Sequence, residues 1–256
     1  MKRVFIMILC CLLLAGCSQA AKKLEQVMTP TEPIRLENPY GAEDFAVVGD
    51  YLACLSGAYQ LGIDVSYWQE DIDWQQVADA GIEFVMIRVG KRGAGEGELT
   101  EDARGREYYA GAKAAGLKVG AYFFSQAITP AEALEEAEFA MQLLQDWELD
   151  MPLVYDWEHY SDNGRTVGMT GDVLTACTVT FCDAVKEAGY TPMVYFNQDQ
   201  ASRLDWTQLN SYPMWLAMYD QDMTYEYRVD MWQYTSSGSV PGISGDVDMN
   251  LYFIYE

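Results

Sequence analysis

Short apolar runs alternate with helical patterns from residue 61 onward, and this alternation limits the folds open to the chain. Five apolar runs are each followed by a helical pattern, which predicts parallel strands joined by helices. The runs cover 62–66, 84–90, 118–125, 152–158 and 191–197, and the helices are expected at 73–81, 101–115, 130–147, 171–188 and 199–210. Gly81 and Gly116 mark two helix ends, and Thr129-Pro130-Ala131-Glu132 predicts a capping box.

The pattern changes after residue 213. Three strand-like runs follow at 214–219, 229–235 and 247–253, joined by segments without helical periodicity. Five strand–helix units and three further strands make eight strands, a number that suits a closed α/β barrel with helices around most of it. We therefore predict one TIM-like (β/α)5β3 barrel over residues 61–256. An accessory β-hairpin around Gly49-Asp50 is expected within residues 41–60, where it plugs or flanks the barrel.

The first forty residues indicate export. Lys2 and Arg3 precede an apolar run over 4–15, which is shorter than the ~20 residues of a membrane span and is typical of a secretory signal. The end of this run, Leu14-Ala15-Gly16-Cys17, resembles a bacterial lipoprotein signal, and the alternative is an ordinary signal peptide with a chance cysteine. We predict a signal peptide at 1–16, lipidation of Cys17 and a flexible tether at 17–40. The domain would then lie at the outer face of the cytoplasmic membrane or in the cell wall.

Charge and residue counts exclude several functions. The formal net charge of −23 disfavours nucleic acid and anionic membrane surfaces as partners, so membrane contact is expected through the lipid only. The chain has one histidine, His159, which excludes an HExxH zinc site and leaves one base for a Ser-His-Asp triad. Cys177 and Cys182 lie on one predicted helix and are interpreted as buried apolar residues rather than a disulfide. The oligomeric state is not predicted.

Acidic residues at the end of the fourth strand are the strongest candidates for chemistry. Residues two apart on a strand face the same side, so Asp156 and Glu158 share a face with Val154. Large apolar residues on the other face favour the helix layer. Asp156 and Glu158 are therefore expected to face the barrel mouth, where the active sites of such barrels lie.

Two more carboxylates are expected beside them. Barrel closure places the last strand next to the first, so Asp248 and Asp64 should be neighbours, although each alone is more typical of a cap or turn. Mutual repulsion and burial would raise the pKa of at least one acid, which is what glycoside hydrolysis needs. Arg88 is predicted to pair with one of the four. His159 is expected at the rim, and the run Glu132–Glu138 is interpreted as a solvated helix face.

Aromatic residues near the same strand ends have two interpretations. They are sugar-binding platforms or packing residues of the barrel, and the sequence favours neither. The candidates are Tyr122, Tyr195, Trp215 and Tyr219.

An ordered set of motifs from residue 61 to the C-terminus resembles glycoside hydrolase family 25, the Chalaropsis-type lysozymes or N-acetylmuramidases. The resemblance implies a flattened (β/α)5β3 barrel that cleaves the β-1,4 bond between N-acetylmuramic acid and N-acetylglucosamine in peptidoglycan. The motifs are Gly62-Ile63-Asp64-Val65-Ser66, Trp68-Gln69, Phe84 to Gly90, Gly120-Ala121-Tyr122, Asp156-Trp157-Glu158, Met193-Val194-Tyr195, Trp215-Leu216-Ala217, Trp232-Gln233-Tyr234 and Val247-Asp248-Met249-Asn250.

Carried over by position, the resemblance makes Glu158 the general acid and Asp156 the carboxylate that orients and stabilises the reacting sugar. It makes Asp64 and Asp248 supporting acids and implies no metal or organic cofactor. One departure is Tyr122-Phe123-Phe124, where many members carry a histidine after the tyrosine.

The sequence leaves the stereochemical course open: substrate-assisted, direct nucleophilic and inverting routes all fit. It also leaves two other functions open. One is a lipid-tethered sugar-binding protein on an inactive barrel, and the other is a glycosidase of another N-acetylated polysaccharide such as chitin.

Overall fold

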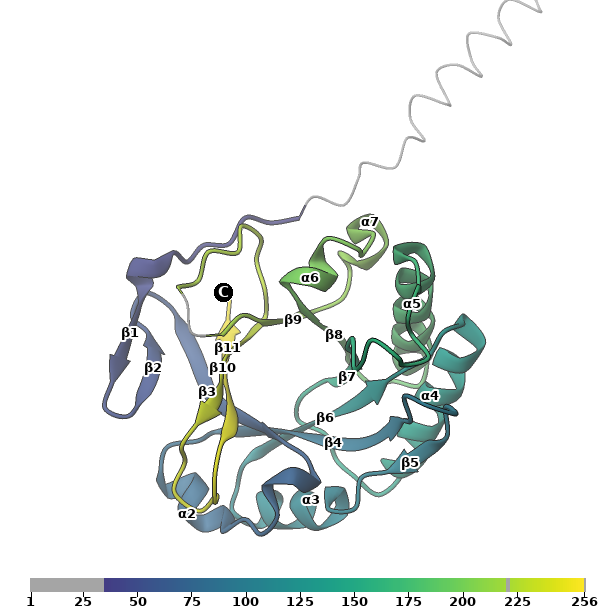
Figure 1. Cartoon of the computed structure of the whole chain (residues 1–256). Helices are drawn as coiled ribbons and strands as arrows, with labels where there is room; N and C mark the ends of the chain where they lie inside the picture. Colours follow the sequence, from purple (N-terminus) through teal and green to yellow (C-terminus); the bar gives the residue numbers. More distant parts are fainter. Residues whose placement is uncertain (1–34, 220–221, 256) are drawn as a thin grey trace, which may run out of the picture. The chain divides into compact units, whose positions relative to one another are not determined.

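Eight β-strands form a closed ring in the part of the chain that the computed structural model describes, residues 35–219 and 222–255 (Figure 1). The strands are β3 (Ala58–Val65), β4 (Phe84–Arg92), β6 (Lys118–Ser125), β7 (Leu153–Trp157), β8 (Pro192–Asn197), β9 (Met214–Ala217), β10 (Met231–Gly238) and β11 (Val247–Ile254). All neighbours from β3 through β10 are parallel, and β11 closes the ring antiparallel to both β10 and β3. The predicted barrel of eight strands is confirmed.

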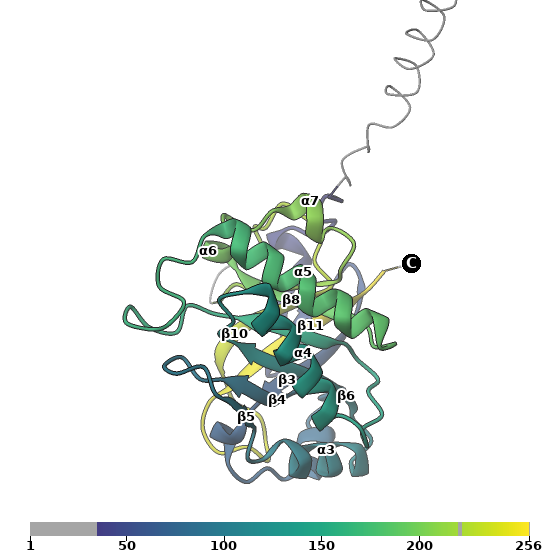
Figure 2. The same cartoon turned by 90° about the vertical axis from the view of Figure 1, so that its right-hand side faces the viewer.

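Helices lie outside the ring of strands around most of its circumference (Figure 1). They are α2 (Trp74–Asp79), α3 (Gly105–Ala114), α4 (Pro130–Leu143), α5 (Gly171–Glu187), α6 (Gln198–Ala201) and α7 (Trp206–Leu209), with the 3-10 turns η1 (Ala42–Asp44) and η2 (Tyr67–Gln69). Helices α4 and α5 pack against each other and against β4, β6, β7 and β8 (Figure 2). Gly81 and Gly116 end α2 and α3 with φ of 91° and 83°, a conformation that favours glycine. No helix among the described residues is both long and apolar enough to span a membrane.

Three of the expected helices differ most from the prediction. The helix expected over 101–115 begins at Gly105, because β5 (Leu99–Glu101) first returns antiparallel along β4. The helix expected to reach residue 147 ends at Leu143, and the weak pattern over 199–210 forms the two short helices α6 and α7.

The predicted capping box at α4 is only half formed. The Thr129 side chain accepts a hydrogen bond from the Glu132 amide, as expected of an N-cap. The Glu132 carboxylate does not return to Thr129; it accepts from the Ile128 amide at 2.9 Å instead.

The predicted hairpin flanks the barrel and does not plug it. Strands β1 (Phe45–Val48) and β2 (Tyr51–Cys54) pair antiparallel around the Gly49-Asp50 turn. The Phe45 ring lies 5.0 Å from Trp232 and 6.1 Å from Phe253, on the outer side of β10 and β11, which no helix of the described chain covers (Figure 1). Residues 58–60, expected in the hairpin, belong to β3, so the barrel begins at Ala58.

The end of the predicted tether is packed on the barrel. The Arg35 guanidinium lies 4.0 Å from the Trp206 ring centroid and 3.9 Å from that of Tyr227. Glu37 forms a β-bridge with Tyr227, and the Asn38 amide donates to the Glu226 carbonyl at 2.9 Å. The packed chain therefore includes residues 35–40. The predicted signal peptide, Cys17 and the rest of the tether lie outside the described residues.

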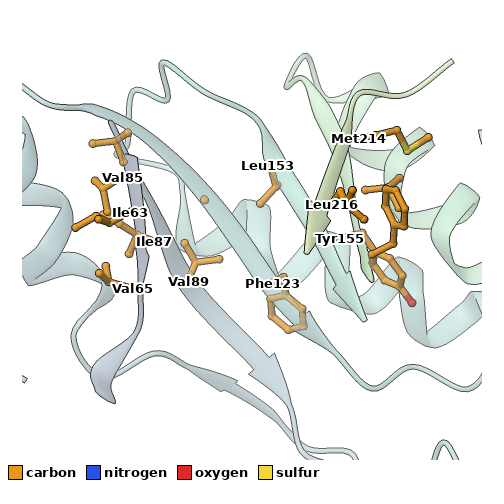
Figure 3. Packing of buried hydrophobic residues seen from close by; sticks show 14 of the residues in the cluster. Ile63, Val65, Val85, Ile87, Val89, Phe123, Leu153, Tyr155, Met214 and Leu216 are labelled. Carbon is orange, nitrogen blue, oxygen red and sulfur yellow. The ribbon is translucent and has the colours of Figure 1, made fainter. Parts of the chain in front are cut away.

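The sheet separates two apolar layers. The outer layer, between strands and helices, contains Phe123, Leu153 and Tyr155 (Figure 3). The inner layer, inside the ring, contains Val154 and other residues of the same strands. Leu153 and Tyr155 thus face the helices while Val154 faces inward, which confirms the predicted orientation of β7.

The cysteines of the described chain are buried thiols. Cys54, Cys177 and Cys182 form no disulfide, as predicted for the latter two. Burial raises the pKa of the Cys177 thiol to about 12, so it remains protonated and behaves as a small apolar group.

Candidate active site

A cleft of about 560 Å³ opens at the carboxyl ends of the parallel strands. Asp64, Asp156, Glu158 and Asp248 all line it. The convergence of four carboxyl groups that strand order and side-chain period predicted is therefore confirmed.

Asp156 and Glu158 come from the end of β7. The Asp156 side chain is buried, and its Oδ1 atom has no hydrogen-bond partner. Glu158 is the first residue after β7. Its backbone no longer pairs with a neighbouring strand, so side chains must hold it in place. Two buried side-chain amides do so: Gln200 donates to the Trp157 carbonyl, and Gln126 Nε2 donates to the Glu158 carbonyl at 2.8 Å.

Asp64 and Asp248 lie directly opposite each other on β3 and β11. Asp64 Oδ2 accepts hydrogen bonds from Gln233 Nε2 at 2.7 Å and from Asn250 Nδ2 at 2.8 Å. The Trp215 indole donates to Asn250 Oδ1 at 2.8 Å and so fixes the orientation of that amide. Gln233 and Asn250 stood in the family motifs but were not predicted as site residues, because a neutral amide on a strand carries no signal of its partner.

Two tyrosines orient the other amide. The hydroxyl groups of Tyr195 and Tyr219 donate to Gln233 Oε1 at 2.9 and 2.6 Å. Gln233 must then present its NH₂ group to Asp64. The predicted residues Tyr195 and Tyr219 therefore support the acid cluster, whatever contact they make with a substrate.

The pKa values of all four carboxyl groups are raised, and burial is the largest cause in each. The pKa of Asp64 rises to about 6, that of Glu158 to about 7 and that of Asp248 to about 8. The pKa of Asp156 is raised well above its usual range, with the charge of Glu158 as the next cause. The hydrogen bonds from Asn250 and Gln233 oppose the rise at Asp64. The cluster therefore retains protons at neutral pH.

Arg88 lines the cleft, but its predicted pairing with one of the four acids is wrong. Its Nε and Nη2 atoms both lie 2.8 Å from Asp102 Oδ2. Asp102 directly follows β5, the strand that the sequence did not predict, so its position beside β4 was also missed. The charge of Arg88 still acts on the cluster, because it lowers the pKa of Asp156.

The predicted aromatic residues differ in exposure. Tyr122, Tyr195 and Trp215 belong to the inner apolar layer and are each less than 10% exposed, whereas Tyr219 is 37% exposed. The most exposed aromatic side chains of the cleft were not among the candidates. They are Trp68, 69% exposed and 4.5 Å from the Tyr67 ring centroid, and Tyr160, 67% exposed.

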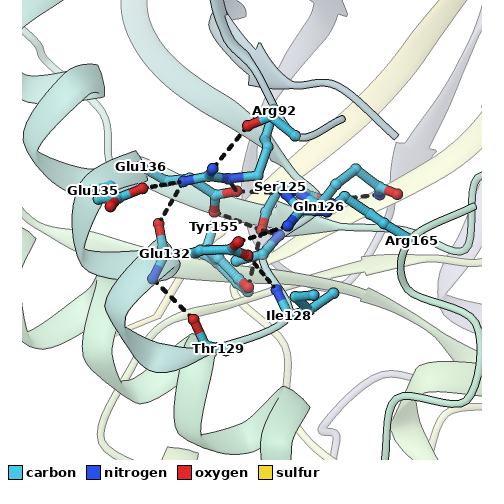
Figure 4. A network of polar contacts seen from close by, with 12 residues as sticks. Arg92, Ser125, Gln126, Ile128, Thr129, Glu132, Glu135, Glu136, Tyr155 and Arg165 are labelled. Atoms are coloured by element: carbon cyan, nitrogen blue, oxygen red, sulfur yellow. Dashed lines mark hydrogen bonds and ion pairs between the residues drawn. The ribbon is translucent and has the colours of Figure 1, made fainter. Parts of the chain in front are cut away.

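A second set of charged side chains joins β4, β6 and α4 through Arg92, which also lines the cleft (Figure 4). Glu136 of α4 is fully buried and accepts hydrogen bonds from Arg92 Nε at 2.8 Å and from Ser125 Oγ at 2.6 Å. Arg92 also donates to the Gly97 carbonyl at 2.8 Å, which fixes the turn between β4 and β5. The interpretation of Glu132–Glu138 as a solvated face is therefore wrong for Glu136. It is also wrong for Glu132, which pairs with Arg165 at 2.6 Å.

His159 lies at the rim, as expected. It is exposed, and its Nε2 atom lies 3.1 Å from Asp162 Oδ1.

Several carboxyl groups in a cleft at the carboxyl ends of barrel strands are the arrangement that a barrel glycoside hydrolase needs. The model of the glycosyl hydrolases family 25 matches residues 63–243, and the chain belongs to this family.

Three relatives illustrate the similarity. The chain is 31% identical over 198 residues to the autolytic lysozyme of Clostridium acetobutylicum, covering 74% of this chain and 54% of that protein. It is 28% identical over 208 residues to lysozyme M1 of Streptomyces globisporus, covering 75% and 67%. The structure of the modular autolysin LytC from Streptococcus pneumoniae with a synthetic peptidoglycan ligand superposes with a TM-score of 0.67 at 25% identity, covering 76% of this chain and 47% of that one. The chain thus spans about half the length of two of these relatives.

Proposed function

We propose that this protein hydrolyses the β-1,4 bond between N-acetylmuramic acid and N-acetylglucosamine in the glycan strands of peptidoglycan. The observation that carries the proposal is the cluster of four carboxyl groups in one cleft, two buried and two half-buried, none of which has a cation partner among the described residues. Such a cluster destabilises the fold, so a structural role does not explain it. Family membership and the names of the lysozyme relatives support the same reaction.

Glu158 is proposed as the general acid. Its pKa of about 7, raised by burial and by Asp248, leaves a large protonated fraction at neutral pH. It also lies beyond the strand end, half-buried in the cleft, where a glycosidic oxygen can approach. Glu158 would donate its proton to the leaving oxygen of N-acetylglucosamine and later take a proton from the attacking water.

Asp156 is proposed to hold the 2-acetamido group of the muramic residue. Asp156 lines the cleft and its buried Oδ1 atom has no hydrogen-bond partner, so this carboxyl group has free capacity to accept a hydrogen bond from the acetamide N–H. The positive charge that develops on the sugar would favour the ionised form of Asp156. The acetamide oxygen then bonds to the anomeric carbon as the glycosidic bond breaks, and water later displaces it from that carbon.

The central test is product analysis on purified peptidoglycan. The wild type should release new muramic reducing ends, and ¹H NMR of the initial products should show retention of the β configuration. Reducing ends on N-acetylglucosamine, or hydrolysis of chitin alone, would show a glycosidase of another specificity. Binding without any new reducing ends would support the sugar-binding alternative.

We also infer that the domain is exported and anchored through Cys17. The proposal depends on the Leu14-Ala15-Gly16-Cys17 signal. The full-length protein and the Cys17→Ala variant should be expressed in a bacterium and fractionated. The wild type should sediment with membranes and the variant should not; equal membrane association of both would contradict the anchor.

A further inference from the structure

The cleft contains three cations, all on β4, and only one lacks a carboxylate partner. Arg88 is paired with Asp102 and Arg92 with Glu136. Lys91 is half-buried in the same cleft and forms no ion pair with any described residue. Its Nζ atom lies 5.9 Å from the centroid of the Tyr67 ring.

The register of the sheet places Lys91 in the same row as the reacting centre. Lys91 lies opposite Phe124 of β6, and Phe124 lies opposite Asp156 of β7. Lys91 is therefore two strand spacings from Asp156, about 10 Å between backbones. That distance is comparable to the length of one sugar ring with a short substituent.

The remaining charges restrict what Lys91 can bind. The four carboxyl groups disfavour an anion next to them, and Arg88 and Arg92 are already paired with carboxylates. The exposed Glu98 lies near Gly93 on the Lys91 side but forms no ion pair with Lys91. A negatively charged substituent would therefore find its unpaired cation at Lys91. Muramic acid carries such a group: its 3-O-lactyl carboxyl is either free or linked to a stem peptide that has carboxylates of its own.

We propose that Lys91 is a specificity residue that binds a carboxylate carried by the muramic residue. This inference rests on the proposed function and deepens it. Lys91 would favour peptidoglycan strands over uncharged N-acetylated polymers. The carboxylate of the lactyl group and those of the stem peptide share this chemistry, and the experiment separates them.

The test compares kcat and KM of the wild type, Lys91→Met and Lys91→Arg on three forms of purified glycan strands. The strands carry intact stem peptides, have the stems removed by an amidase, or have all carboxyl groups neutralised as methyl esters. On the charged strands Lys91→Met should raise KM about tenfold, the scale of a partly solvated hydrogen bond to a charged group, and Lys91→Arg should restore most of it. On neutralised strands the three proteins should be equal. Lys186→Met, an exposed lysine of α5 away from the cleft, is the matched control and should behave as the wild type.

The outcomes separate the sources and the hypotheses. An effect confined to stem-bearing strands would identify the stem-peptide carboxylates as the groups that Lys91 binds. An effect that persists on stripped strands would identify the lactyl carboxylate. An unchanged KM on every substrate, or an equal loss on neutralised strands, would overturn the proposal.

A binding measurement keeps this test independent of turnover. Isothermal titration of stem-bearing and stripped strands into Glu158→Gln, with and without Lys91→Met, should show about tenfold weaker binding for the double variant on the strands that carry the bound carboxylate. Equal affinities for both forms of strand would overturn the role of Lys91. Loss of affinity with no wild-type hydrolysis would overturn the proposed reaction and leave Lys91 as a binding residue.

Discussion

Glu136 and the four cleft acids are all removed from solvent to a large extent in this barrel, and they differ in what surrounds them. Glu136 of α4 is bonded to the guanidinium of Arg92 and to the Ser125 hydroxyl. The cleft acids, of which Asp156 has a carboxyl oxygen without any partner, have no ion pair with a described cation. Burial raises the pKa of both groups, to about 7 for Glu136 as for Glu158. Burial alone therefore does not mark a catalytic acid; access to the cleft and free hydrogen-bonding capacity do.

The largest expected effect is on catalysis at the cleft acids. Glu158→Gln preserves shape and hydrogen bonding but cannot donate the proton, so kcat should fall by about 10²–10⁴-fold while the melting temperature does not fall. Asp156→Asn should also be strongly impaired. Release of reducing ends from peptidoglycan measures both. Wild-type turnover by Glu158→Gln would show that Glu158 is not the general acid, and the cleft acids would then differ from Glu136 only in their partners.

The second effect is on stability at the paired acid. Arg92→Met would leave Glu136 buried without its cation, and breaking a buried pair of this kind costs about 3–5 kcal/mol of unfolding free energy. The loss should be greater above pH 7 than at pH 5, where Glu136 can take up a proton. Denaturant unfolding measures it. The matched control is Arg106→Met, which breaks the exposed pair with Glu101 and should cost no more than about 1 kcal/mol.

The barrel architecture and the positions of the cleft acids could be predicted, because both follow from local periodicity and strand order. The two-residue period of β7 separates Val154 and Asp156 from Leu153 and Tyr155, and closure of the ring brings Asp248 to Asp64. No comparable sequence pattern indicates which distant residue a given side chain will contact in the folded protein.

The partner of Arg88 shows this most clearly. The chain turns back along β4 as the three-residue strand β5, too short to register as a periodic pattern, and Asp102 follows it. Glu136 was missed for a related reason: its neighbours on α4 are also acidic, and only the packing of α4 on the barrel shows which of them is buried.

A third prediction concerns stability against pH. The folded-state pKa values of Asp64, Glu158 and Asp248 exceed their unfolded values, so the folded protein binds more protons between about pH 4 and pH 8. Unfolding free energy should therefore decrease as pH rises through this window. Asp248→Asn should reduce the slope and stabilise the protein at pH 8. Denaturant midpoints at several pH values test this, and a stability that increases with pH would contradict the pKa assignments.

The smallest effect is expected at the N-terminal boundary. Removal of residues 1–34 should leave stability and turnover unchanged, whereas removal of 1–40 should lower the melting temperature by a few degrees, because Arg35 stacks on Trp206 and Tyr227. Thermal unfolding of the two shortened chains decides this. Equal melting temperatures would show that residues 35–40 contribute nothing.

Glu158 can act as the general acid only if it is protonated at neutral pH, and side-chain ¹³C NMR can follow its protonation in the wild type and in Asp248→Asn. The carboxyl of Glu158 should titrate near pH 7 in the wild type, and the rate of peptidoglycan hydrolysis should fall over the same range as the proton is lost. In Asp248→Asn both midpoints should move to lower pH but stay above the ordinary range, because burial is the largest cause of the raised pKa of Glu158 and Asp248 adds to it. A Glu158 carboxyl that titrates near the ordinary value of about 4.3 would contradict its role as the acid.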